Sequence, residues 1–132
     1  MNIIIDTNIL VRISVDDEQS GSARELFQKA LTVTITTHVF CEYAWVLSSV
    51  YNYGKSEIAR AIREFMNNAK VLLKEDEVEA GLQMLEDGGD FADGVISYAG
   101  RAMAPSPETF VSFDKRAVRL LAGRGQSALT PF

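Results

Sequence analysis

The sequence is poor in the two residues that most often bind soft metals or cross-link small proteins. It contains one cysteine, Cys41, and one histidine, His38. A single cysteine excludes an internal disulfide, and the apolar residues around Cys41 indicate a buried thiol in a reducing cytoplasm. A catalytic cysteine would need a base held against it, and His38 precedes Cys41 without a recognisable nucleophile motif.

Long hydrophobic runs are also missing. No apolar stretch approaches the length of a membrane span, and the chain enters a predicted strand at Ile3 without a basic leader, so we expect neither membrane insertion nor export. There is no GxxxxGK[ST] loop, which argues against a P-loop nucleotide hydrolase. With 132 residues, of which 47% are hydrophobic and 23% charged, the chain fits a single domain over residues 1–132 with a full core.

Basic residues are few, and the net charge is −5. This balance argues against a protein that coats nucleic acid by bulk electrostatics. The charge is uneven, because residues 1–98 carry 8 basic against 16 acidic side chains, whereas residues 99–132 carry 5 against 2. The basic residues near the C-terminus could still contact phosphates, although for most of them exposure to solvent on a helix face is the better explanation. They are Arg101, Lys115, Arg116, Arg119 and Arg124.

Predicted strands alternate with predicted helices along the chain. The apolar spacing predicts strands at residues 3–5, 33–36, 71–73 and 109–113, with a short edge strand in the tail at 128–132. Helices are predicted at residues 9–14, 22–31, 37–51, 56–66, 77–86, from 90 onward, and at 115–121. This alternation indicates an α/β fold, a three-layer α/β/α sandwich with a central, mainly parallel sheet.

Two carboxylates follow predicted strands. Asp6 comes directly after the first strand, and Asp114 repeats the pattern after the strand at 109–113. An acid in this position is often only a turn former or the cap of the next helix. In an open parallel sheet, however, the carboxyl ends of the strands are also where ligands bind.

Three further acids stand out from their surroundings. Glu42 lies in a predicted helix that is apolar on almost every side, so we expect a buried carboxylate with a compensating cation, either a basic side chain or a metal. A salt bridge or an exposed glutamate is the plainer alternative. Asp90 and Asp93 begin an apolar helix, and capping explains one of them without requiring both.

In the predicted architecture Asp6, Glu42, Asp93 and Asp114 can reach one cleft. Clustered carboxylates raise one another's pKa, so such a cleft is stable at neutral pH only with bound cations or protonated acids. Oxygen ligands without histidine or cysteine favour Mg²⁺ or Mn²⁺ over zinc. Such ions activate water and hold phosphate oxygens, which favours phosphodiester hydrolysis. Phosphatases and phosphoacceptor domains use similar clefts, but the acidic pair and late lysine of a receiver domain are missing here.

Four short motifs resemble those of PIN-domain proteins, specifically the VapC-type toxin ribonucleases of bacterial toxin–antitoxin pairs. They are Asp6-Thr7-Asn8-Ile9-Leu10, Glu42 with Tyr43-Ala44-Trp45-Val46-Leu47, Asp90-Phe91-Ala92-Asp93, and Ser112-Phe113-Asp114-Lys115. Their order and spacing are similar to the family's over nearly the whole chain. Each motif is weak alone, and the four together are fairly specific.

The resemblance implies a PIN-like fold and a role for each motif. Asp6, Glu42, Asp93 and Asp114 would be the metal-binding catalytic acids, with Asp90 as an auxiliary ligand. Thr7, Asn8 and Ser112 would orient acids or waters; the family commonly has threonine where this chain has Ser112. The family further implies Mg²⁺-dependent cleavage of RNA, homodimers, and inhibition by a small antitoxin.

The residues and the resemblance together predict a metal-dependent endoribonuclease in which Mn²⁺ can replace Mg²⁺. Lys115 and Arg116 are the first candidates for contact with the RNA backbone. The alternative is a catalytically silent PIN-fold module that binds RNA or a protein partner without cutting. The presence of all four acids favours the enzyme.

Overall fold

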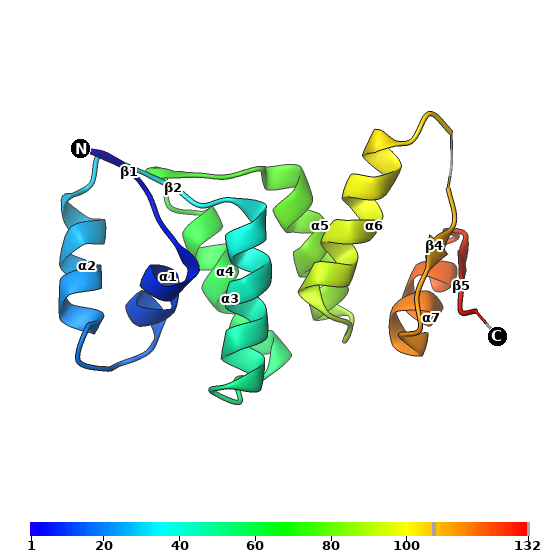
Figure 1. The fold of residues 1–132 in the computed structure, drawn as a ribbon, viewed down its shortest axis with the longest axis horizontal. Helices are drawn as coiled ribbons and strands as arrows, with labels where there is room; N and C mark the ends of the chain where they lie inside the picture. The colour runs from blue at the N-terminus through cyan, green and yellow to red at the C-terminus, as the bar shows by residue number, and fades with distance from the viewer. Residues whose placement is uncertain (107, 132) are drawn as a thin grey trace. The chain divides into compact units, whose positions relative to one another are not determined.

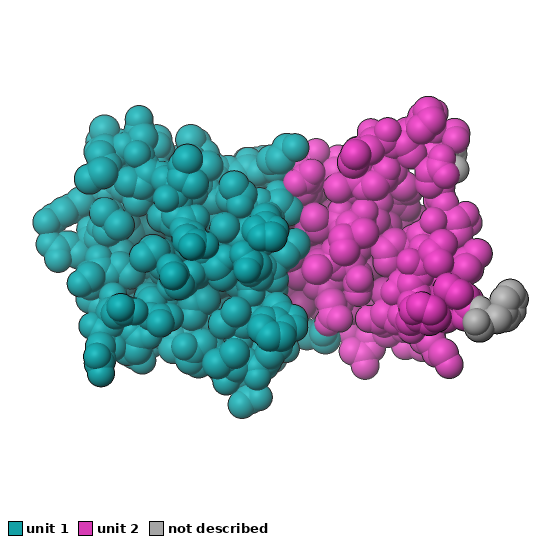
Figure 2. Space-filling view, in the orientation of Figure 1, with its two compact units in different colours: residues 1–75 teal, residues 76–132 magenta. Residues whose placement is uncertain are grey.

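The structure is a computed structural model that describes residues 1–106 and 108–131. Helices and short parallel strands alternate along the chain (Figure 1), which confirms the α/β class and is consistent with a PIN-like α/β/α fold. The residues divide into two compact units, 1–75 and 76–132, shown in different colours in Figure 2. The prediction of one domain over residues 1–132 stays a prediction.

Unit 1 (residues 1–75) is built on a three-stranded parallel sheet. Its strands are β1 (Asn2–Ile4), β2 (Thr32–Thr34) and β3 (Val71–Leu72), in the order β1-β2-β3. Val33 lies opposite Ile3 on one side and Val71 on the other, and Val33 is fully buried. Successive side chains alternate between the faces of a sheet, which places Ile4 and Leu72 on the opposite face, where both are exposed.

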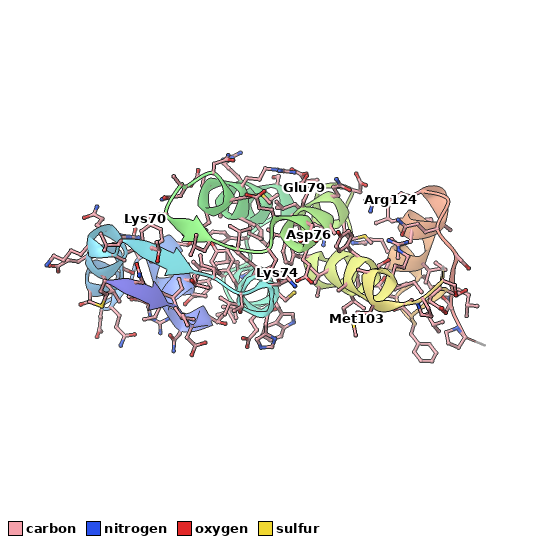
Figure 3. All side chains as sticks on the ribbon, turned by 90° about the horizontal axis from the view of Figure 1, so that it is seen from above. Lys70, Lys74, Asp76, Glu79, Met103 and Arg124 are labelled. Atoms are coloured by element: carbon pink, nitrogen blue, oxygen red, sulfur yellow. The ribbon has the colours of Figure 1, made fainter. Side chains whose placement is uncertain are left out.

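Helices connect the strands of unit 1 in pairs. Two of them, α1 (Thr7–Ser14) and α2 (Ser20–Lys29), lie between β1 and β2 in the sequence, and α3 (Thr37–Ser49) and α4 (Lys55–Met66) lie between β2 and β3. Lys70, labelled in Figure 3, holds the end of α2. Its ammonium donates hydrogen bonds to the backbone carbonyls of Phe27, Gln28 and Ala30. Such contacts satisfy carbonyls that a helix end leaves unpaired.

The core of unit 1 fixes the helix that carries Glu42. Phe40, Tyr43 and Leu47 of α3 are fully buried. The hydroxyl of Tyr43 lies 2.6 Å from that of Ser14 in α1, a hydrogen bond that ties the two helices together. Burial raises the pKa of Tyr43 to about 12, so this phenol is neutral at physiological pH.

Unit 2 (residues 76–132) contains most of α5 (Glu75–Glu86), together with α6 (Phe91–Met103) and α7 (Lys115–Gly123). Its strands β4 (Phe110–Val111) and β5 (Ala128–Leu129) pair in parallel, with Phe110 opposite Ala128. Helices α5 and α6 approach closely at Gly94, because a Cβ there would overlap the carbonyl oxygen of Ala80. Outside the strands, Arg124, labelled in Figure 3, forms an ion pair with Asp87 near the end of α5.

The structure confirms the predicted order of helices and strands, with ends that differ by a few residues and strands that are shorter than predicted. Phe132, in the predicted tail strand, lies outside the described residues. In the described part of the chain, no helix is long and apolar enough to cross a membrane.

Candidate metal centre

Three carboxylates gather in unit 2. Asp90, Asp93 and Asp114 each offer one oxygen, and these oxygens all lie within 4.8 Å of one another. We call these three residues the acid triad. Asp90 is exposed, whereas Asp93 and Asp114 are partly buried. Two of the predicted catalytic acids and the predicted auxiliary acid therefore meet at one place.

The start of α6 presents two members of the triad. Asp90 is the N-cap residue of α6 and has extended backbone angles, and its carbonyl accepts a hydrogen bond of 3.1 Å from the Asp93 amide. The side chain of Asp90 makes no capping hydrogen bond. The usual structural explanation for an aspartate in this position, capping by the carboxylate, therefore does not apply to Asp90.

Asp114 is held more firmly than the others. Its Oδ1 accepts hydrogen bonds from the backbone amides of Arg116 (3.0 Å) and Ala117 (3.1 Å), which makes it the N-cap of α7. Its own amide donates to Ser112 Oγ at 2.9 Å. Capping therefore uses Oδ1 and fixes the direction of the carboxylate, while Oδ2 makes no hydrogen bond to another described residue.

The other two acids lie in unit 1 and share a threonine. Asp6 is exposed and caps α1, and its Oδ1 accepts a hydrogen bond of 2.7 Å from the Thr7 amide. The hydroxyl of Thr7 donates to Glu42 Oε1 at 2.9 Å. Thr7 thus connects the two carboxylates within this unit, and we call Asp6 and Glu42 the acid pair.

The prediction that Glu42 is buried is wrong. Its side chain is 50% exposed. Helix α3 is apolar nearly all round, but unit 1 covers only one side of it: Trp45, one turn along from Glu42, is 66% exposed. The alternative prediction, an exposed glutamate, agrees with the structure, in which Glu42 accepts a hydrogen bond from Thr7.

A further partner of Glu42 was missed in the sequence. His38 Nε2 lies 3.2 Å from Glu42 Oε1, one helical turn away, and forms an ion pair with it when protonated. The spacing of four residues within a predicted helix was the signal that could have found this contact. From the sequence, His38 is considered only as a base for Cys41, whose side chain is partly buried in the structure.

The remaining predicted residues surround these groups. Asn8 is exposed beside Thr7 at the start of α1, and Lys115 is exposed at the start of α7. Arg116 is exposed as well, and its Nη1 donates to the carbonyl oxygen of Gly88 at 3.0 Å. This contact holds a cation near the loop that leads into Asp90.

The chemistry of the triad suits a hard divalent cation. Three carboxylates within 4.8 Å repel one another when ionised, and a bound cation removes that repulsion. Oxygen-only ligand sets favour ions such as Mg²⁺ and Mn²⁺. The residues present therefore fit a divalent metal.

Comparison with known protein families matches residues 3–120 to the PIN domain. The chain belongs to the PIN domain family. PIN domains are generally nucleases that use divalent metal ions, which agrees with an acidic cluster in this PIN domain. Searches of curated proteins and of solved structures gave no match.

Proposed function

We propose that this PIN-domain protein is a Mg²⁺-dependent endoribonuclease that hydrolyses RNA phosphodiester bonds, with Mn²⁺ as an effective substitute. The observation that carries the proposal is the acid triad, which offers three carboxylate oxygens within 4.8 Å inside a PIN domain. Capping fixes the direction of the Asp114 carboxylate, whereas the Asp90 side chain makes no capping hydrogen bond.

Asp6, Glu42, Asp93 and Asp114 are the proposed catalytic metal ligands, and Asp90 is the auxiliary one. When bound, the ion lowers the pKa of water and neutralises charge on the phosphate. The hydrogen bonds around Thr7 support a positioning role, since they orient one oxygen of Asp6 and one of Glu42. Ser112 holds the backbone of Asp114 in the same way, and Asn8 is proposed to orient a water.

The basic side chains next to Asp114 are proposed to hold the RNA. Lys115 and Arg116 are exposed at the N-terminus of α7, directly after the acid. Cations here offset the repulsion between the acids and the phosphates of the substrate. The Arg116 contact with Gly88 supports this role, since it limits where the guanidinium can go.

The biological role that we propose is that of a VapC-type toxin in the bacterial cytoplasm. The four motifs around Asp6, Glu42, Asp93 and Asp114 support it, and so does membership of the PIN family. This role entails a homodimer and a small antitoxin protein encoded next to the toxin gene. Expression in bacteria should arrest growth, and co-expression of the neighbouring small reading frame should relieve the arrest.

The decisive experiment is cleavage of a mixed RNA pool by the purified protein with Mg²⁺ or Mn²⁺. Cleavage should disappear in EDTA and in Asp6→Asn, which keeps a capping side chain. Asp16→Asn is the matched control, because Asp16 is an exposed acid whose ion-pair partner among the described residues is Arg24, and the change should leave cleavage intact. Cleavage that survives in Asp6→Asn would contradict the assignment. A folded protein that binds Mn²⁺ and RNA without cutting would instead be the silent binding module.

A further inference from the structure

Unit 2 contains a pocket that the proposed catalytic acids do not use. It has a volume of about 270 Å³ and lies between α6 and the segment that leads into β4. We call it the α6–β4 pocket. On the helix side it is lined by Ser97, Gly100 and Arg101, and on the strand side by Glu108, Thr109 and Phe110.

Ser97 is a buried polar residue of this pocket whose hydroxyl has no partner among the described residues. Only 5% of the residue is exposed, and its Oγ makes no hydrogen bond to any described residue. A serine inside a helix commonly bonds back to a carbonyl one turn earlier, but Ser97 does not. A buried hydroxyl without a partner is unfavourable, so Ser97 is an unusual feature of this pocket wall.

Two opposite charges line the same pocket without pairing with each other. Arg101 lies one helical turn beyond Ser97 and forms no hydrogen bond or ion pair with another described residue. Glu108 accepts a hydrogen bond of 3.2 Å from Ser106 Oγ, which leaves its second oxygen for another donor. The pocket therefore offers a cation and a carboxylate to one small molecule.

We propose that the α6–β4 pocket binds an unpaired guanine base. Among the RNA bases, only guanine has two adjacent N–H donors on its Watson–Crick edge, which match the carboxylate of Glu108. Guanine also presents O6 and N7, the acceptors that arginine recognises, to Arg101. Phe110 supplies an apolar wall for the ring, and unpaired bases are commonly held by such mixed pockets.

The pocket lies along the same helix as the acid triad. Asp93, Ser97 and Arg101 are spaced four residues apart on α6, so they follow one another along one side of the helix. Ser97 lies about 6 Å along the axis from Asp93, and Arg101 about 12 Å, from the rise per residue of an α-helix. A strand cut at the triad could place a neighbouring base in the pocket, an extension that rests on the proposed ribonuclease function.

The test measures binding of nucleotides to the full chain by calorimetry in EDTA, so that the acids cannot recruit the phosphate through a metal. GMP and AMP carry the same phosphate, so a difference between them reports the base. GMP should bind about tenfold more tightly than AMP, as expected when charge-assisted hydrogen bonds are lost. Equal affinities, or no binding of GMP, would overturn the proposal.

Two variants locate the binding. Gly100→Leu should fill the pocket without harming the fold, because a Cβ at Gly100 meets nothing within 4 Å and leucine favours a helix. Gly21→Leu in α2 meets equally open space and is the matched control. Gly100→Leu should abolish GMP binding, Gly21→Leu should not, and Glu108→Gln should remove the preference over AMP. GMP binding that Gly100→Leu leaves unchanged would place the site elsewhere.

The two proposals fail separately. GMP selectivity without cleavage of any RNA would support guanine binding in the pocket and contradict the ribonuclease activity. Metal-dependent cleavage without GMP selectivity would support the ribonuclease activity and contradict guanine binding in the pocket. If both hold, Gly100→Leu should reduce cleavage next to guanine and leave the metal dependence of the remaining cleavage unchanged.

Discussion

The acid pair of unit 1 and the acid triad of unit 2 use the same functional group in different surroundings. Asp6 and Glu42 both accept hydrogen bonds from Thr7, and His38 lies within ion-pair distance of Glu42. In the triad, three carboxylates lie within 4.8 Å of one another. The pair is stabilised locally by neutral donors and an exposed imidazole, whereas the triad concentrates negative charge.

This difference suggests how the two groups contribute to metal binding. Hydrogen-bond donors orient a carboxylate and share its lone pairs, while close carboxylates create the potential that attracts a cation. We therefore expect the triad to dominate metal affinity. The pair should adjust it, because the donors around Thr7 control where the oxygens of Asp6 and Glu42 point.

Removing one charge from the triad should have the largest effect. Asp114→Asn keeps an N-cap side chain for α7, so the fold should be retained while a metal ligand is lost. We expect Mn²⁺ affinity and cleavage to fall about 100-fold. Titration with Mn²⁺ measures the affinity, and an RNA cleavage assay measures the activity. Asp87→Asn, at an acid paired with Arg124 outside the triad, is the control, and equal losses in both variants would contradict a specific role for Asp114.

Metal binding should stabilise the folded chain by a comparable free energy. At a Mn²⁺ concentration about 100 times the Kd, mass action adds about 2.7 kcal/mol to the free energy of unfolding. Calorimetry should show a higher Tm with Mn²⁺ than with EDTA, and Asp93→Asn should remove most of the increase. If Glu42→Gln leaves the increase unchanged, the triad alone binds the ion and the acid pair has another role.

The sequence predicted the helices and strands well because most follow from apolar periodicity and short polar breaks. It also placed Asp114 between a strand and a helix, a position that the backbone alone determines. The burial of Glu42 was predicted wrongly from the sequence. The composition of α3 shows that the helix is apolar but not which of its sides is packed against the core. The sequence also could not predict that the Ser97 hydroxyl is buried without a hydrogen-bond partner, because this depends on residues that are distant in sequence.

The hydroxyl of Thr7 offers a way to change the acid pair without removing a charge. Thr7→Val keeps the shape of the side chain and the hydrogen bond from the backbone amide to Asp6 Oδ1. It loses the hydrogen bond from the hydroxyl to Glu42. We expect Mn²⁺ affinity to fall about tenfold, the lower end of the range for groups that orient metal ligands. Thr7→Ser restores the hydroxyl and should restore affinity. A serine variant as weak as the valine one would point to packing rather than to orientation.

The smallest effect should come from His38. Its side chain is 82% exposed and that of Glu42 is 50% exposed, and ion pairs of this kind on a helix surface contribute about 0.5 kcal/mol or less. His38→Ala should therefore leave the Tm almost unchanged at pH 7. Because the imidazole shares Oε1 with Thr7, its removal should also leave Mn²⁺ affinity within about twofold, as expected for a weak exposed contact. A larger gain in Mn²⁺ affinity would show that His38 competes with the ion for Glu42, so that the local partners of the acid pair limit its use as a ligand.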